Sequence, residues 1–195
     1  MKKELLREYN KKLGKQTVTF NLSSATDCIS KKKGLCKNKN FCYAMKSERQ
    51  YKQVLSYRRR QNKYWYNTQI SQIIKDFKEY YKNKRKKPKY LRINESGDIK
   101  KEDIKKIIKI AEEFQELIIY LYTARYDLAD EIKNMKKPKN LIVNGSNFML
   151  DNEFRVIFKD DLKNLNRYSK VCIANCTNCK QCMIKAHQTI YVLKH

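Results

Sequence analysis

The stretch 117–122 (LIIYLY) is apolar at six consecutive positions, and this feature restricts the fold most strongly. A strand that is apolar on both faces is typical of a parallel sheet that is covered on both sides. Shorter strands are expected at 17–22, 90–93, 141–143 and 154–158, with helical segments between several of them. This alternation predicts an α/β fold, either an open parallel sheet or a partial (β/α) barrel.

Apolar residues at three- and four-residue steps predict the helices between these strands. The clearest stripe comprises Tyr66, Ile70, Ile73, Ile74, Phe77 and Tyr81, within one long helix. Further helices are expected over 104–111 and 128–135. Because the chain shows neither an internal repeat nor a linker, we expect one domain over 1–195, with a cysteine-rich segment, 170–195, packed on it.

The charge of the chain is strongly one-sided. The 195 residues include 45 Lys and Arg against 20 Asp and Glu, a formal net charge of +25. Residues 1–90 hold 26 of these basic residues and 6 of the acidic ones, so the excess is concentrated there. A positive field attracts polyanions, and nucleic acid, DNA or RNA, is therefore the expected partner. A solvated surface without a polyanion and an anionic membrane surface are the alternatives.

Basic and aromatic side chains alternate in the segment 57–66, which predicts where a nucleic acid would bind. Guanidinium groups clamp phosphates, and aromatic rings stack on exposed bases. The alternative is an amphipathic helix that buries its aromatic face, and both hold if the helix buries Trp65 and presents Arg59. The candidate contact residues are Arg58, Arg59, Arg60, Lys63, Tyr64 and Trp65.

No apolar run reaches the roughly 20 residues that cross a bilayer, and the first residues lack the apolar core of a signal peptide. We therefore expect a cytoplasmic protein without a membrane partner. In a reducing compartment, the seven cysteines are expected to be metal ligands or catalytic groups. The chain has no P-loop and no Rossmann glycine fingerprint, so nucleotide binding of those kinds is not expected.

The string CIANCTNCKQC holds four cysteines, Cys172, Cys176, Cys179 and Cys182, at spacings of four and three positions. Zinc sites usually combine two CxxC pairs separated by a longer loop. Thiolates at successive CxxC steps are instead typical of the runs that bind a 4Fe-4S cluster. The crowding favours an iron–sulfur cluster here, with zinc as the alternative.

A second group, Cys28, Cys36 and Cys42, lies in a polar loop after the first expected strand. The loop is rich in lysine, which is expected to favour the thiolate form, although each thiol alone could be a small buried apolar group. Three thiolates leave one iron of a four-iron cluster open, whereas four close it. The chain therefore predicts one or two clusters, because a single centre built from both ends is the alternative division.

An aromatic residue directly before the third cysteine, as in Phe41-Cys42, resembles the cluster loop of radical S-adenosylmethionine enzymes, although this loop is longer. The segment NESGD after the second strand is similar to the place where that superfamily contacts the methionine amino group, although the customary double glycine is missing. The resemblance implies a radical-SAM-like fold, S-adenosylmethionine as a candidate cofactor, and Glu95 and Asp98 as its candidate ligands.

The chain more closely resembles the phage gene product 88 family. The matching pieces are CYA, VLSYRRRQN, LRINESGD, YLYTARY, NLIVNGSN and CTNCKQCMIK followed by IYVLKH, in this order over most of the chain. The resemblance implies a phage or mobile-element context and a metal site, and it leaves the reaction open.

Other catalytic residues are few. His187 and His195 are the two histidines, and a ligand role is considered for His195. Glu95, Asp98 and Asp127 are the carboxylates that a metal-dependent nuclease would use. We therefore expect a phage iron–sulfur protein that binds nucleic acid, and the resemblance to radical S-adenosylmethionine enzymes implies a reaction on that nucleic acid. A zinc-stabilised nucleic-acid-binding module without catalysis is the alternative.

Overall fold

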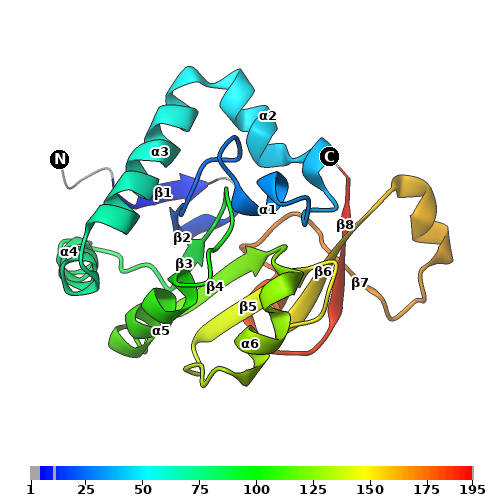
Figure 1. Cartoon of the computed structure of the whole chain (residues 1–195). Coiled ribbons are helices and arrows are strands. Elements are labelled where there is room, and N and C mark those ends of the chain that lie inside the picture. Colours follow the sequence, from blue (N-terminus) through cyan, green and yellow to red (C-terminus); the bar gives the residue numbers. More distant parts are fainter. Residues whose placement is uncertain (1–4, 11, 195) are drawn as a thin grey trace.

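An eight-stranded sheet forms the centre of the fold (Figure 1). This computed structural model describes residues 5–10 and 12–194. β1 is antiparallel to β2, and the other neighbouring strands are parallel. In spatial order the strands are β1 (Arg7–Asn10), β2 (Gly14–Phe20), β3 (Tyr90–Ile93), β4 (Ile118–Thr123), β5 (Leu141–Ser146), β6 (Asn152–Ile157), β8 (Thr189–Leu193) and β7 (Lys170–Val171).

The strands from β2 to β6 lie in the order in which they occur in the chain, so successive connections step along the sheet in one direction. The prediction of an α/β fold with an open, mostly parallel sheet is confirmed. The five expected strands correspond to β2, β3, β4, β5 and β6. The sequence analysis missed β1, β7 and β8, which lie at or near the two edges of the sheet.

The helices lie mainly between consecutive strands. The α-helices are α1 (Ile29–Lys32), α2 (Tyr43–Gln50), α3 (Lys52–Asn67), α4 (Ile70–Lys82), α5 (Asp103–Glu113) and α6 (Ala129–Asn134). Short 3-10 helices are η2 (Lys39–Phe41), η3 (Tyr126–Leu128), η4 (Lys159–Asn164) and η5 (Gln181–Met183). In the described part of the chain, no helix combines the length and apolar character required to cross a membrane.

The expected long helix with the stripe from Tyr66 to Tyr81 is two helices, which corrects the prediction. Thr68 and Gln69 are extended, with ψ angles of 136° and 145°, and they separate α3 from α4. The apolar stripe continues across this break because both helices pack against the same core. Hydrophobic periodicity therefore identified the buried side chains correctly but not the change in direction.

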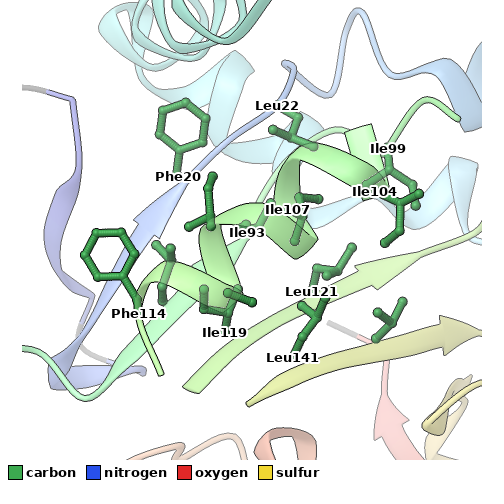
Figure 2. Close-up of a cluster of buried hydrophobic side chains, with 14 of the residues drawn as sticks. Phe20, Leu22, Ile93, Ile99, Ile104, Ile107, Phe114, Ile119, Leu121 and Leu141 are labelled. Carbon is green, nitrogen blue, oxygen red and sulfur yellow. The ribbon is translucent and has the colours of Figure 1, made fainter. Parts of the chain in front are cut away.

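The main core lies between the sheet and the helices of one face. Phe20 of β2 joins the sheet to the helices α3 and α4, because the centroid of its ring lies 5.7 Å from that of Trp65 and 5.6 Å from that of Phe77. Burial of a large apolar side chain contributes about 1.5–3 kcal/mol, so this layer is the main source of stability. Figure 2 labels ten of its residues: Phe20, Leu22, Ile93, Ile99, Ile104, Ile107, Phe114, Ile119, Leu121 and Leu141.

The cysteine-rich C-terminal segment covers part of the other face of the sheet. Met183 packs there with Tyr120 of β4 and Ile142 of β5, and Cys176 lies against this small cluster. The same segment contacts the turn between β1 and β2. A Cβ on Gly14, which has φ +80°, would lie 2.6 Å from Thr177 Oγ1, so this close approach requires glycine.

Candidate metal centres and basic face

The first three cysteines lie in the loop that joins β2 to α2, beyond the carboxyl end of β2. Cys28 directly precedes α1, and Cys42 directly precedes α2, with Cys36 between them. All three are half-buried and none forms a disulfide. The short helices α1 and η2 therefore arrange the three thiols around one end of the parallel sheet.

Asp98 ties this loop to two neighbouring strand ends. Its carboxylate accepts hydrogen bonds from Ser30 Oγ (2.6 Å), Ala124 N (2.8 Å) and Ile99 N (2.8 Å). Burial raises the pKa of Asp98, although these hydrogen bonds oppose the effect. Asp98 is 5% exposed, and these three donors engage its carboxylate, so Asp98 anchors the loop to the strand ends. Its role as an S-adenosylmethionine ligand stays a prediction.

Glu48 of α2 fixes the start of the same loop. Its carboxylate accepts hydrogen bonds from Ala25 N (2.6 Å) and Thr26 N (3.0 Å), and it forms an ion pair with Arg58 Nη1 at 2.8 Å. The same Nη1 donates to Ala44 O at 2.9 Å. The side chain of Arg58 is 3% exposed and its Nη1 is bound inside the protein, so the prediction that Arg58 contacts nucleic acid does not fit this placement.

The NESGD segment, 94–98, packs directly against the loop after β2. Gly97 has φ +80°, and a Cβ there would lie 2.1 Å from Ser23 Oγ and 2.6 Å from Ser23 O. Asn94 also has a positive φ of 63°, and its Oδ1 accepts a hydrogen bond from Leu22 N at 3.2 Å. Glu95 is half-buried, and Asn10 Nδ2 donates to its Oε1 at 2.7 Å.

The thiols of the first group influence one another's protonation. Burial, followed by the negative charge of Asp98, raises the pKa of Cys28 to about 11. Burial also raises the pKa of Cys36, and the charge of nearby Cys42 adds to this effect. The charge of Lys39 lowers the pKa of Cys36, as the lysine-rich loop predicts, but desolvation outweighs this effect and the pKa is raised overall.

The second group lies on the face of the sheet opposite the main core, in the segment that packs on β4 and β5. It comprises Cys172, Cys176, Cys179 and Cys182. Burial raises the pKa of Cys182 to about 12, although a hydrogen bond with Tyr122 opposes this effect. Burial also raises the pKa of Cys176, and this effect outweighs the positive charge of Arg92, which acts in the opposite direction. Cys182 is influenced by Cys172 and Cys176, and Cys176 by Cys179, so these four thiols form a second neighbourhood.

Arg92 of β3 lies between the two cysteine groups. Its Nη2 donates to the hydroxyl of Tyr43, the residue after Cys42, at 2.8 Å. Its guanidinium carbon lies 5.0 Å from the ring centroid of Tyr122. The side chain of Tyr122 is in turn hydrogen-bonded to Cys182. Arg92 and Tyr122 were not among the predicted site residues. Arg92 interrupts the apolar residues of β3, and Tyr122 shares with Tyr120 the face of β4 that lies opposite the main core.

The donor chemistry of both groups suits thiolate-binding metals, since all seven cysteines are unpaired. Within residues 5–10 and 12–194, no three Cys, His, Asp or Glu side chains are already arranged to hold a metal ion. Asp127 Oδ1 lies 2.7 Å from Arg125 Nε, so this carboxylate is engaged in an ion pair, whereas among the described residues the other two carboxylates of the predicted nuclease set, Glu95 and Asp98, form none. His187 is exposed, and His195 lies outside the described residues.

The outer face of α3 carries the exposed part of the predicted nucleic-acid site. A shallow hollow there is lined by Lys52, Leu55, Ser56, Arg59, Arg60 and Lys63. Arg59 is exposed and its Nε lies 2.8 Å from Asp27 Oδ2, one residue before Cys28. The basic face and the first cysteine loop therefore adjoin each other.

The aromatic residues of α3 face the protein interior. Trp65 is 0% exposed, and its Nε1 donates to Asp103 Oδ1 at 2.8 Å. Tyr64 is half-buried, and its hydroxyl donates to Asp76 Oδ2 at 2.7 Å. A fully enclosed ring has no face on which a base can stack, so the predicted nucleic-acid contact of Trp65 is corrected to a role in the core.

The comparisons with known proteins yield one match. The family model described as Gene product 88 matches residues 3–181. No curated protein and no solved structure matches the chain.

Proposed function

This chain belongs to the gene product 88 family of phage proteins, and we propose that it is an iron–sulfur protein that binds nucleic acid in the host cytoplasm. One observation carries the proposal. The seven cysteines are all unpaired, and they form two separate neighbourhoods, three at the carboxyl end of the parallel strands and four on the opposite face of the sheet. Seven thiols without disulfide partners, gathered in two groups, support a role as metal ligands.

The two groups suit different roles. Cys28, Cys36 and Cys42 would hold a 4Fe-4S cluster with one open iron, and Cys172, Cys176, Cys179 and Cys182 would hold a closed one. An open iron is the position at which radical-SAM-like enzymes bind and cleave S-adenosylmethionine. The open, mostly parallel sheet, in which β2 to β6 follow one another in chain order, and the half-buried carboxylate of Glu95 beside this loop support that chemistry.

The nucleic-acid part of the proposal rests on α3. Arg59, Arg60 and Lys63 line one exposed face, and the pair between Arg59 and Asp27 brings that face next to Cys28. Lysine and arginine side chains that contact phosphates supply most of the sequence-independent affinity for nucleic acids. A polyanion bound to α3 would therefore lie beside the first metal centre.

The metal centres are tested by purifying the full-length protein anaerobically and measuring iron and zinc. We expect a brown protein with about eight irons per chain. Replacing Cys28, Cys36 and Cys42 with serine should remove about half of this iron, and replacing the other four cysteines should remove the other half. Each variant is the control for the other. A colourless protein that contains zinc alone would replace this proposal with a zinc-stabilised binding module.

The nucleic-acid face is tested by the anisotropy of a labelled oligonucleotide as salt is raised. Arg60→Gln with Lys63→Gln should weaken binding and reduce the salt slope by about two. The matched control is Lys105→Gln with Lys109→Gln, two exposed lysines of α5 that give the same change in charge. Equal losses in both double variants would mean that net charge alone drives binding, and would remove α3 from the proposal.

A further inference from the structure

Two phenylalanine rings lie exposed beside the first cysteine loop. Phe41 is 43% exposed and directly precedes Cys42, and Phe158, at the end of β6, is 51% exposed. Their ring centroids are 6.0 Å apart at an interplanar angle of 84°. Exposed aromatic surface next to a candidate site marks an interaction surface more often than an isolated exposed residue does.

Hydrogen bonds of the main chain fix the backbone on which the two rings stand. Phe41 N donates to Asn38 O at 3.0 Å, and Phe158 N donates to Asp161 Oδ2 at 2.8 Å. Lys194 N, at the end of β8, donates to Ile157 O at 2.9 Å. The rings therefore have fixed positions at the same edge of the sheet as the thiols, where the ends of β6 and β8 approach the α1 region (Figure 1).

A cation accompanies the two rings. Lys194 Nζ lies 3.8 Å from the centroid of Phe41 and 4.7 Å from that of Phe158. Lys159 directly follows Phe158, and Lys39 lies two residues before Phe41. Asp161, one of two acidic residues that follow Lys159, already accepts a hydrogen bond from Phe158 N. The surface thus combines aromatic rings with ammonium groups, the two features that recognise an unpaired base and its phosphate.

We infer that Phe41, Phe158 and Lys194 form a platform for an unpaired base of single-stranded nucleic acid. The net charge of +25 favours a nucleic acid over an apolar peptide as the occupant. The rings favour a single strand over a duplex, because the bases of a duplex are already stacked on one another. This inference rests on the proposed nucleic-acid function, and it names the class of nucleic acid that reaches the first metal centre.

The test compares two labelled single strands of equal length, one with bases and one abasic, at the same salt concentration. Anaerobically purified full-length protein should bind the strand with bases at least about fivefold more tightly, since stacking on aromatic residues adds affinity for each base. Phe158→Leu keeps an apolar side chain and adjoins no cysteine. It should reduce this preference without changing the affinity for the abasic strand or the metal content. Phe41→Leu should act in the same direction.

The control is Tyr168→Leu, which removes an aromatic ring that is 71% exposed at a different place. It should leave the preference unchanged. If the wild-type protein binds both strands equally and with the usual salt dependence, the platform is overturned while the proposed nucleic-acid function stands. If both strands fail to bind, both are overturned. An unchanged preference in Phe158→Leu also overturns the platform.

Discussion

The buried ion pair between Arg58 and Glu48 leads to a sharp prediction. Both side chains are nearly inaccessible, at 3% and 2% exposure, and the Nη1 to Oε1 distance is 2.8 Å. Arg58→Met keeps the apolar stem but leaves the carboxylate of Glu48 without its cation. Breaking a buried pair in this way costs about 3–5 kcal/mol. Because Glu48 retains hydrogen bonds from Ala25 and Thr26, we expect about 3 kcal/mol.

In a domain of this size, 1 kcal/mol shifts Tm by about 2–4 °C, so Arg58→Met should lower Tm by roughly 6–12 °C. The expected loss also depends on pH. Burial alone would raise the pKa of Glu48, but hydrogen bonds from Ala25 and Arg58 outweigh it and hold the pKa below its ordinary value of 4.5. This contribution is present above that value and is lost as the pH falls. The difference between variant and wild type should therefore shrink in acid.

The assay is thermal unfolding followed by circular dichroism at neutral and acidic pH, together with oligonucleotide binding to the folded proteins. Arg60→Gln, on the exposed face of the same helix, is the control. It should change the free energy of unfolding by less than about 0.5 kcal/mol and weaken nucleic-acid binding. If Arg58→Met unfolds at the wild-type Tm but loses nucleic-acid affinity, the assignment of Arg58 as a structural residue is refuted.

The remaining predictions concern the loops, the core and the metal. Gly97→Ala should destabilise the fold by at least about 1–3 kcal/mol in denaturant unfolding, because of its positive φ and the contact with the loop after β2, and a wild-type curve would contradict this. Trp65→Phe should cost about 1–3 kcal/mol through the lost bond to Asp103 and leave oligonucleotide affinity unchanged. A fall in affinity alone would restore its predicted contact role. Removing bound metal with a chelator should lower the Tm of the wild type more than that of Arg92→Met, because the buried charge of Arg92 would lose the thiolates that compensate it. Equal shifts in Tm would argue against this compensation between Arg92 and Cys182.

The strands that sequence could predict are those in the interior of the sheet. β3, β4 and β5 are short apolar runs between polar segments, and their register follows from burial on one or both faces. β7 has two residues, and β1 (REYN) is charged or polar at three of its four positions, so neither presents a pattern that can be distinguished from a loop. Edge strands depend on pairing with a strand that is already formed, which is tertiary information.

The basic helix α3 shows why the candidate nucleic-acid site could be predicted only in part. Arg58, Gln61 and Trp65 recur at steps of three and four and form the buried face of α3, while Arg59 and Lys63 lie on the other face. Periodicity alone would have assigned Arg58 to the interior. Its basic character argued against that, because its partner Glu48 comes from another helix and becomes apparent only in the folded structure.

Arg92 makes the two cysteine groups interdependent. A buried guanidinium is costly without a compensating negative charge, and its Nε has no hydrogen-bond partner among the described residues. The positive charge of Arg92 lowers the pKa of Cys176 and Cys182, although burial keeps both raised, so the metal-free thiols remain largely protonated at neutral pH. A bound metal centre would hold them as thiolates, and the thiolates would supply the negative charge that compensates Arg92. Since Arg92 also donates to Tyr43 beside Cys42, filling the second centre would stabilise a contact that positions the first.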